Sequence, residues 1–357
     1  MERTGIVLLN LGGPWSLDRV KPFLRSLFRD RDIIPFPGGP ALQGFWSWML
    51  STFRAPAVRK RYGEIGGGSP LLYWSRVQAL GLERRLSGTA PADPTEEEKA
   101  AILNFDVDHP GLPEGLSDGP FVTAACMRYS EPGARAALRH LAWKGCRRAV
   151  VLPLYPQECM ATTGSSLIDL EKAAAGMADA PERVVVRSYH DHPIYLRAMA
   201  ERVREGLARF DERKRKDLLV LFSAHAVPIR IAESGDPYVA QVKETVIGLA
   251  GELAGEIGRH RLAWQSRVGP IEWTGPGTDE VLAELGRQGV RNVLVVPLSF
   301  VSDHIETLHE IDIEFAEVAE EAGIGRMERS PALNESPIFL DALCEITKTA
   351  LAGAPEK

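Results

Sequence analysis

The sequence predicts an α/β protein with two similar domains, each a parallel sheet flanked by helices. Short, nearly continuous apolar runs alternate with longer segments of helical periodicity. Parallel strands that are covered on both faces show such runs, and regular alternation of strand and helix is typical of doubly wound folds. The length of 357 residues leaves room for about two domains.

Seven segments are expected to form buried strands, because each is a short apolar run bounded by polar or turn-forming residues. They are Ile6–Asn10, Val122–Met127, Ala149–Leu154, Val184–Ser188, Leu218–Ser223, Leu262–Ser266 and Asn292–Leu298. The main helix candidates between and after them are Gly133–Trp143, Ser166–Ala175, Tyr195–Arg209, Val239–Ile257, Thr278–Gln288 and Pro337–Leu351.

One segment occurs twice, 144 positions apart, at residues 144–154 and 288–298. In each copy a helix ends at glycine and a strand closes with Pro-Leu. This repeat predicts two Rossmann-like domains, residues 1–180 and 181–330, and a last helix within residues 331–357 that could pack on either. Ligands of such sheets bind beyond the carboxyl ends of the strands. We therefore expect the active site in a cleft between the two domains.

The net charge of −6 is concentrated in one segment. Residues 90–120 hold eight acidic residues, one lysine and five prolines, so this segment carries −7 and the rest of the chain +1. We expect a surface insertion or a long loop here. The absence of a basic balance argues against a nucleic-acid partner. The nearly neutral remainder does not repel a membrane surface.

The cysteine pattern and the termini favour a cytoplasmic protein. Cys126, Cys146, Cys159 and Cys344 form no C-x-x-C pair, which argues against a zinc or dithiol site and favours a reducing compartment. The N-terminal apolar run is too short for a signal peptide, and no stretch is long enough for a membrane span. The glycine-rich segments match no phosphate-binding motif, so no nucleotide cofactor is expected.

His225 is the first candidate for chemistry. It follows the apolar strand Leu218–Ser223 and precedes Pro228, at the end where open α/β sheets present functional groups. An imidazole can exchange a proton near neutral pH or bind a metal. A histidine in a capping or turn position is the alternative.

A row of acidic residues follows the second copy of the repeat. Asp303, Glu306, Glu310 and Glu314 have the spacing i, i+3, i+7 and i+11, which places them on one face of a helix. A solvated acidic face is one interpretation. The other is a row of oxygen ligands for a divalent cation or for protons, which the neighbouring His304 would extend.

An aromatic segment precedes a basic one near the N-terminus. Leu42, Phe45, Trp46, Met49 and Phe53 repeat at helical spacing, and several arginines and a lysine follow. The pattern fits an ordinary core helix. It also fits an exposed lip that lines an apolar pocket or enters a bilayer surface.

Ten short blocks, in their order along the chain, together resemble the ferrochelatase family, whose members insert Fe²⁺ into a porphyrin. They are Gly5–Pro14, Arg29–Ile34, Tyr62–Pro70, Met127–Tyr129, Tyr155–Gln157, Thr162–Leu167, Phe222–His225, Gly235–Tyr238, Trp264–Pro270 and Ser302–Leu308.

The resemblance implies a set of site residues and a chelatase-like fold. His225 and Glu306 would face each other at the metallation site and bind the metal, and Asp303, His304 and Glu310 would continue an acidic metal path. Two pyrrole protons must leave as the metal enters, which requires a general base such as His225. Porphyrin contacts are implied for six residues: Tyr238, Trp273, Arg128, Ile34, Ser223 and Phe300.

The resemblance also bears on cofactors, partners and location. Fe²⁺ would be a substrate. No iron–sulfur cluster is expected, because only Cys344 lies near the C-terminus and Met160 stands where a further cluster cysteine would match. Phe45–Phe53, within residues 41–53, matches the family's hydrophobic lip, often tied to membrane contact. The protein could attach peripherally to the inner face of the membrane. It could also contact the preceding or following protein of the haem pathway. Ala226 departs from the family's usual Gly or Ser.

Protoporphyrin IX is the expected substrate, with three alternatives. The first is a chelatase for coproporphyrin, or one that loads cobalt or nickel into another tetrapyrrole, because ligand type alone does not select the metal. The second is a porphyrin- or haem-binding protein without catalysis. The third is a nucleotide-dependent enzyme, which the missing phosphate motifs disfavour.

Overall fold

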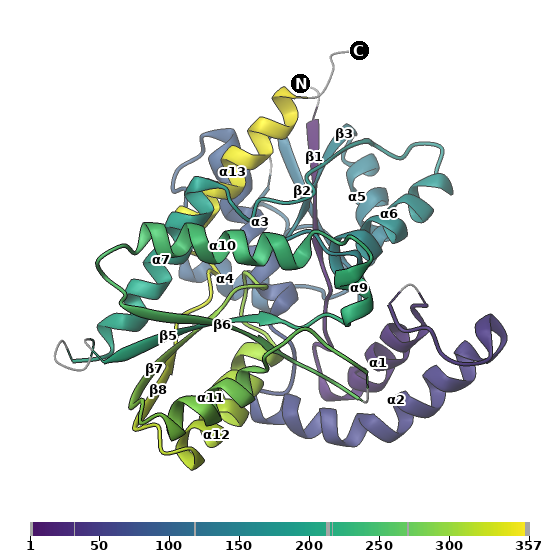
Figure 1. Cartoon of the computed structure of the whole chain (residues 1–357). Helices are drawn as coiled ribbons and strands as arrows, with labels where there is room; N and C mark the ends of the chain where they lie inside the picture. Colours follow the sequence, from purple (N-terminus) through teal and green to yellow (C-terminus); the bar gives the residue numbers. More distant parts are fainter. Residues whose placement is uncertain are drawn as a thin grey trace. The chain divides into compact units, whose positions relative to one another are not determined.

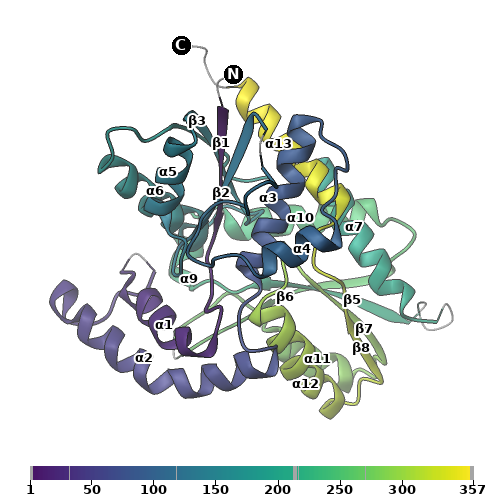
Figure 2. The same ribbon diagram turned by 180° about the vertical axis from the view of Figure 1, so that it is seen from behind.

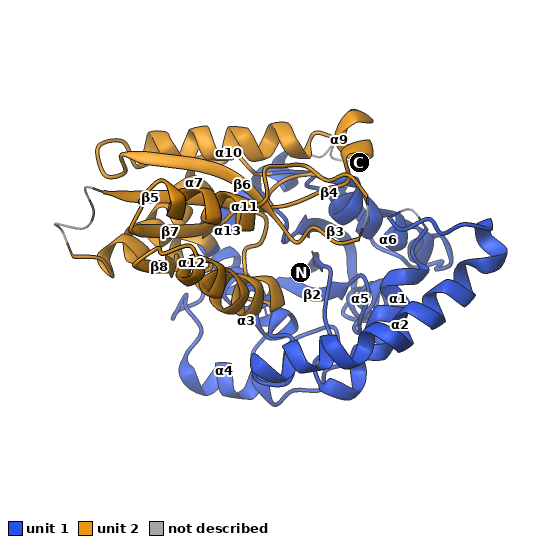
Figure 3. Ribbon diagram, turned by 60° about the horizontal axis from the view of Figure 1, so that its bottom comes forward, with its two compact units in different colours: residues 1–155, 159–188, 340–357 blue, residues 156–158, 189–339 orange. Residues whose placement is uncertain are grey.

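The computed structural model describes residues 3–31, 33–117, 119–211, 215, 217–269 and 271–353. The chain forms two compact units (Figure 3). Unit 1 holds residues 1–155, 159–188 and 340–357, and unit 2 holds residues 156–158 and 189–339. Three residues of the matched blocks and of the acidic segment, Asp32, Asp118 and Pro270, lie outside the described residues.

Unit 1 contains a four-stranded parallel sheet with the strand order β2-β1-β3-β4, of which Figure 1 labels β1, β2 and β3. The strands are β1 (Arg3–Asn10), β2 (Phe121–Met127), β3 (Cys146–Pro153) and β4 (Glu182–Val185). Helices α5 (Ala134–Trp143) and α6 (Ser165–Ala175) pack on one face. Helix α3 (Leu71–Ser87) packs on the sheet beside α13 (Pro337–Ala352) (Figure 2).

The contact between α3 and α13 fixes the C-terminal helix on unit 1. Leu340 lies so close to Gly81 that a side chain at Gly81 would collide with it. Arg85 pairs with Asp341 at 2.6 Å. These contacts explain why the last helix, which follows unit 2 in the sequence, belongs to unit 1.

Unit 2 repeats the same topology, with the strand order β6-β5-β7-β8. The strands are β5 (Leu218–His225), β6 (Arg259–Gln265), β7 (Asn292–Pro297) and β8 (Arg326–Arg329). One face carries α11 (Thr278–Arg287), η3 (Glu306–Phe315) and α12 (Ala316–Glu321). The remaining helices are α7 (Pro193–Ala208), α9 (Ile229–Glu233) and α10 (Tyr238–Glu252), and α7 packs on β7 and α10.

The sequence repeat corresponds to equivalent positions in the two sheets. The amide of Leu154, after β3, donates to the carbonyl of Leu9 at 2.8 Å. The amide of Leu298, after β7, donates to the carbonyl of Ser223 at 2.9 Å. Both units then continue through a loop into a π-helical segment, η2 (Met160–Gly164) in unit 1 and η3 in unit 2. The predicted duplication is therefore confirmed.

The acidic segment is not one long loop, and that part of the prediction is wrong. It contains α4 (Glu96–Leu103), which begins with a capping box formed by Thr95 and Glu98. Such boxes satisfy free amides at a helix start. Glu98 also pairs with Arg84 of α3. The buried Arg76 guanidinium donates to the carbonyl of Asp106 at 2.6 Å. The Glu98 side chain and the Asp106 main chain thus anchor the segment to α3.

Helix α2 (Gly39–Glu64) buries a polar face and exposes an apolar one. It follows η1 (Leu17–Arg19) and α1 (Val20–Arg29), against which it packs. Its buried residues include Gln43, Ser47 and Ser51, and these contact main-chain groups. Gln43 Nε2 donates to the carbonyl of Phe28 at 2.8 Å, and Ser47 Oγ donates to that of Arg25 at 2.6 Å.

Most of the apolar stripe of α2 is consequently left exposed. Phe53 is 77% exposed and Phe45 is 52% exposed, and the exposed fractions of Trp48 and Leu42 are only slightly smaller. Trp46 is half-buried and donates its Nε1 proton to the carbonyl of Pro37. The core-helix interpretation of this stripe is therefore wrong, and the stripe is exposed as a lip would be.

Candidate functional site

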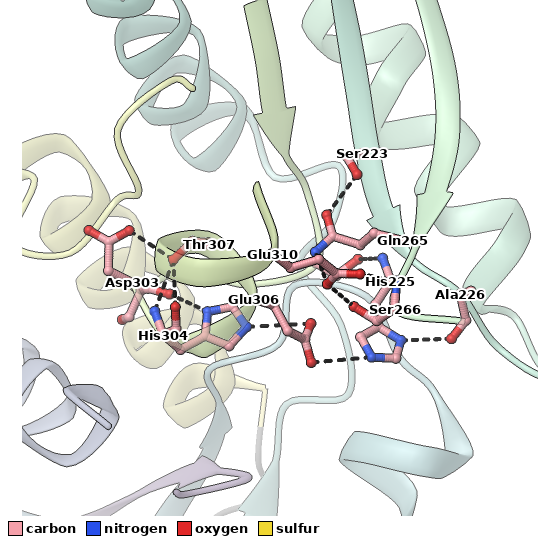
Figure 4. A network of polar contacts seen from close by, with 12 residues as sticks. Ser223, His225, Ala226, Gln265, Ser266, Asp303, His304, Glu306, Thr307 and Glu310 are labelled. Carbon is pink, nitrogen blue, oxygen red and sulfur yellow. Dashed lines mark hydrogen bonds and ion pairs between the residues drawn. The ribbon is translucent and has the colours of Figure 1, made fainter. Parts of the chain in front are cut away.

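His225 and Glu306 come together at the carboxyl edge of the unit 2 sheet (Figure 4). His225 is the last residue of β5, and Glu306 begins η3, in the connection that follows β7. Strands β5 and β7 are parallel neighbours, so their carboxyl ends meet at one edge. The two segments are 81 positions apart in the chain, and only the sheet topology joins them.

The imidazole of His225 is held between a carboxylate and a carbonyl. Its Nε2 lies 3.4 Å from Glu306 Oε1. Its Nδ1 donates to the carbonyl of Ala226 at 2.7 Å, which leaves Nε2 facing the carboxylate. The Ala226 contact uses the main chain, which every residue supplies. The departure at position 226 therefore leaves this bond unchanged.

The two groups shift each other's pKa in opposite directions. Burial disfavours the charged imidazole, but the Glu306 carboxylate and the Ala226 carbonyl outweigh burial and raise the pKa of His225 to about 9. Burial disfavours the carboxylate as well, yet His225 and His304 hold the pKa of Glu306 well below its usual range. Near pH 7 the pair is thus an imidazolium and a carboxylate.

His304 approaches the other oxygen of Glu306. Its Nε2 lies 3.5 Å from Glu306 Oε2, and each of these two buried atoms has no hydrogen-bond partner among the described residues. The ring of Phe300 lies 4.0 Å from that of His304 and 5.9 Å from that of His225. Glu306 therefore lies between two imidazoles (Figure 4). The ring of Phe300 contacts both imidazoles.

Glu310 lies one turn further along η3, and its carboxylate accepts hydrogen bonds from residues at the end of β6. Ser266 donates its amide at 2.7 Å and its hydroxyl to the carboxylate, and Gln265 Nε2 adds a third bond at 3.3 Å. Ser266 has φ +65°, a left-handed conformation that brings its amide and hydroxyl to one carboxylate. Burial and the Glu306 carboxylate raise the pKa of Glu310 above its usual value.

Ser266 and Gln265, which hold Glu310, are not among the candidate site residues that the sequence predicts, although both lie in a matched block. Ser223 donates to Gln265 Oε1 at 2.6 Å and so orients that amide toward Glu310. A residue with positive φ leaves no signal in a single sequence unless it is glycine or asparagine. The polar Gln-Ser pair directly after a strand was the available clue.

The predicted helical row of four carboxylates is wrong at its first member. Asp303 precedes the helix, where it accepts from Thr307 Oγ1 at 3.0 Å and from Asn334 Nδ2 at 2.8 Å, and pairs with Arg329 at 2.9 Å. The π-helical bonds of η3 also widen its turns relative to an α-helix. The described residues contain no group of three or more His, Cys, Asp and Glu side chains arranged to hold a metal ion.

Three of the implied porphyrin contacts in unit 2 differ in exposure. Ser223 and Tyr238 are buried and make hydrogen bonds within the protein. Trp273 is half-buried and donates its Nε1 proton to the carbonyl of Val268 at 3.2 Å. It lines a cavity of about 620 Å³ together with Ile271 and Glu310. The porphyrin-binding roles of all three stay predictions.

Arg128 and Ile34 belong to unit 1. Arg128 donates to Asp30 at 2.6 Å and to Ser165 at 2.8 Å, and the same Asp30 oxygen accepts from Tyr129 at 2.8 Å. Arg128 and Asp30 line a cavity of about 600 Å³ whose other charged residues are all basic: Lys21, Arg25 and Arg29. Ile34 is half-buried, and its carbonyl accepts from Gln43.

Comparisons with known proteins match nearly the whole chain. The ferrochelatase family model covers residues 3–100 and 109–351, so only a short part of the acidic segment interrupts it. The ferrochelatase of Gloeobacter violaceus is 43% identical over 349 residues, which span 97% of each chain. That of Geobacter metallireducens is 40% identical over 98% of this chain and 99% of its own.

A third relative and a solved structure complete the comparison. The ferrochelatase of Geotalea uraniireducens is 40% identical over 99% of both chains. The structure of CbiX, the terminal enzyme for biosynthesis of siroheme in denitrifying bacteria, covers 98% of this chain and 99% of its own at 13% identity and a TM-score of 0.46. That match is too distant to add to the assignment, which depends on the sequence relatives. The chain belongs to the ferrochelatase family.

Proposed function

We propose that this chain is a lyase that inserts Fe²⁺ into protoporphyrin IX, and that His225 and Glu306 form the metallation site. The observation that carries this proposal is the pair itself. A half-buried imidazole faces a carboxylate at 3.4 Å, with a second imidazole on the far side of that carboxylate. Imidazole and carboxylate are suitable ligands for ferrous iron as an incoming substrate.

The reaction releases two protons, because Fe²⁺ replaces the two pyrrole N–H hydrogens of the free porphyrin. His225 is placed to accept a pyrrole proton at Nε2, while its Nδ1 stays bonded to the Ala226 carbonyl. The Glu306 carboxylate, 3.4 Å from that nitrogen, is placed to stabilise the imidazolium that forms. Because two protons leave, His225 must release the first to water before it accepts the second. His225 must first lose the proton that it carries near neutral pH, since its pKa is raised to about 9.

This order of events predicts the pH dependence of the reaction. The value of kcat/KM should increase with pH as His225 becomes neutral, with an apparent pKa near the value of about 9. Zn²⁺ in place of Fe²⁺ allows the profile to be measured in air. A flat profile between about pH 6.5 and 9.5 would contradict a proton-accepting role for His225.

The choice of tetrapyrrole and metal requires direct measurement. Protoporphyrin IX and coproporphyrin III should be compared in parallel under anaerobic conditions with Fe²⁺, by following the porphyrin and haem absorption bands. We expect faster conversion of protoporphyrin IX. Faster conversion of coproporphyrin III, or a preference for Co²⁺ or Ni²⁺, would support the related chelatase instead. Binding of both porphyrins without turnover would support a carrier.

We propose further that the reaction needs no iron–sulfur cluster and no nucleotide. The side chains of all four cysteines, Cys126, Cys146, Cys159 and Cys344, are buried as free thiols. Purified protein should show no absorbance from a cluster, and ATP should not raise its melting temperature. Either signal would overturn this part of the proposal.

We also propose a cytoplasmic location with peripheral contact at the inner face of the membrane, made by α2. Its exposed Leu42, Phe45, Trp48 and Phe53 lie next to the basic residues Arg54, Arg59, Lys60 and Arg61. Apolar side chains beside cations bind the surface of anionic bilayers. No helix in the described part of the chain is long and apolar enough to cross a membrane. Contact with a neighbouring haem-pathway enzyme would be favoured at such a surface.

Vesicle binding tests the role of α2. Replacing Phe45, Trp48 and Phe53 together by serine should reduce co-sedimentation with phosphatidylglycerol vesicles by about tenfold, because apolar burial is lost. Replacing the equally exposed Leu103 and Trp143, which lie outside α2, serves as the matched control. Equal binding by the α2 variant and the wild type would show that α2 is not the membrane contact.

A further inference from the structure

Two side chains other than that of Glu306 bind the main chain of His225. The amide of His225 donates to Ser299 Oγ at 2.9 Å. The hydroxyl of Tyr238 donates to the carbonyl of the same residue at 2.9 Å. The two hydroxyl oxygens, of Ser299 and Tyr238, lie 2.6 Å apart. Both polar groups of the His225 main chain are therefore bound by one pair of hydroxyls.

The direction of each hydrogen bond in this arrangement is determined. A carbonyl only accepts, so the Tyr238 hydroxyl uses its single proton on His225. The bond between the hydroxyls must then come from the proton of Ser299. The Ser299 hydroxyl accepts from the His225 amide and donates to the Tyr238 hydroxyl oxygen. The Tyr238 hydroxyl in turn donates to the His225 carbonyl. The three bonds form a closed ring that begins and ends on the main chain of His225.

The position of Ser299 explains why a side chain is needed there. Strand β7 ends at Pro297, which is paired with Ser223, so the β5 ladder has no β7 partner at His225. Ser299 lies just beyond that end and supplies the missing acceptor. Ser299 is 8% exposed and Tyr238 is 5% exposed, so water does not readily replace either hydroxyl.

The next residue links this ring to the imidazole. Phe300 follows Ser299 directly, and its ring contacts the imidazoles of His225 and His304. The dipeptide therefore holds His225 twice, by the main chain through Ser299 and by the ring through Phe300. The His225 side chain also depends on its own Ala226 carbonyl, whose position follows from the same stretch of backbone.

We propose that Ser299 is a positioning residue for His225, acting through the ring that it forms with Tyr238. This inference rests on the proposed role of His225 in metallation. By fixing the backbone at the end of β5, Ser299 sets the distance and orientation of the imidazole relative to Glu306 and to the incoming porphyrin. Small displacements of a reacting group have large effects on rate.

Three variants of the full-length chain test the proposal: Ser299→Ala, Ser299→Thr and Tyr238→Phe. Ser299→Ala removes the acceptor and should lower kcat for metallation about tenfold, with KM for the porphyrin changed less than about twofold. Ser299→Thr keeps the hydroxyl and should restore most of kcat. Tyr238→Phe opens the ring at its other side and should lower kcat in the same manner.

Thr245→Val is the matched control. Thr245 is a buried hydroxyl on α10, the helix of Tyr238, and it bonds to Gln157 and to main-chain carbonyls away from His225. It should lower the melting temperature about as much as Ser299→Ala but leave kcat within about twofold. Equal loss of kcat in both variants would assign the effect to general destabilisation and overturn the proposal.

His225→Ala distinguishes failure of this inference from failure of the proposed function. If His225→Ala is inactive while folded Ser299→Ala keeps the wild-type kcat, only the positioning role of Ser299 is refuted. If His225→Ala itself keeps full activity, the role proposed for His225 is refuted, and the positioning role fails with it.

Discussion

Replacing His225 by alanine is expected to lower kcat for iron insertion by about 10²–10⁴-fold, the range that a positioned general base contributes. The affinity for porphyrin should change by less than about threefold, because the imidazole offers little contact area. Stopped-flow absorbance under anaerobic conditions measures the first quantity. Quenching of tryptophan fluorescence by porphyrin measures the second.

The chain offers a matched control for this variant. His190 is buried in unit 2 and pairs with Glu244 at 2.6 Å, away from the metallation site. His190→Ala therefore also breaks a contact between an imidazole and a carboxylate, and should retain kcat. Near-normal turnover in His225→Ala would refute its assignment as the base.

Replacing Glu306 by glutamine should have the second largest effect, a loss of about 10²-fold in kcat. The neutral amide cannot stabilise the imidazolium that forms at His225, and it binds a metal cation more weakly than a carboxylate does. The variant should also change the titration of His225. Without the carboxylate, burial is opposed only by the Ala226 carbonyl and by Glu310, and the pKa of His225 should fall from about 9 toward its ordinary value.

Two measurements check the Glu306 variant separately. NMR titration of the His225 ring protons reports the pKa, and metallation kinetics report the catalytic role. Glu244→Gln, which alters the His190 pair instead, is the control for both. An unchanged His225 titration would contradict the expected effect of the Glu306 carboxylate on the pKa of His225. A fall in apparent iron affinity with unchanged kcat would make Glu306 a metal-handling residue rather than the partner that stabilises the His225 imidazolium.

The sheet topology was largely predictable from the sequence. Each of the seven expected strands overlaps an observed one. The central strands β1, β3, β5 and β7 are buried and therefore apolar at most positions. The expectation of a buried strand at Val184–Ser188 is wrong, because β4 shares only two residues with it and is at most half-buried. β8 was missed because its residues are Arg326, Met327, Glu328 and Arg329. All four are only half-buried, so the strand has no continuous apolar run.

Helix α2 shows where pattern analysis loses information. Spacing identified the apolar stripe correctly, but spacing cannot say which face of a helix is buried. In α2 the polar Gln43 and Ser47 face α1, because its carbonyls offer them hydrogen-bond acceptors. The aromatic face is left exposed. The deciding contacts are with residues more than ten positions away, which no local pattern contains.

The candidate site likewise contains residues that the sequence predicts and residues that it does not. His225 was predictable because it follows an apolar strand, and Glu306 because acidic residues repeat after the second Pro-Leu. Ser266, Ser299 and the π-helical form of η3 were not, since each depends on backbone geometry or on a partner from another strand. Asp303 was misplaced on the helix because its partners, Asn334 and Arg329, come from a later segment.

The most direct test of the account is a double-mutant cycle on the two site residues. The single-turnover rate of metallation should be measured for the wild type, His225→Ala, Glu306→Gln and the double variant, each shown to bind porphyrin. If the two side chains act as one proton-accepting pair, the double variant should be within about threefold of the slower single variant. Losses that multiply in the double variant would show that His225 and Glu306 act independently, and would contradict the proposed mechanism.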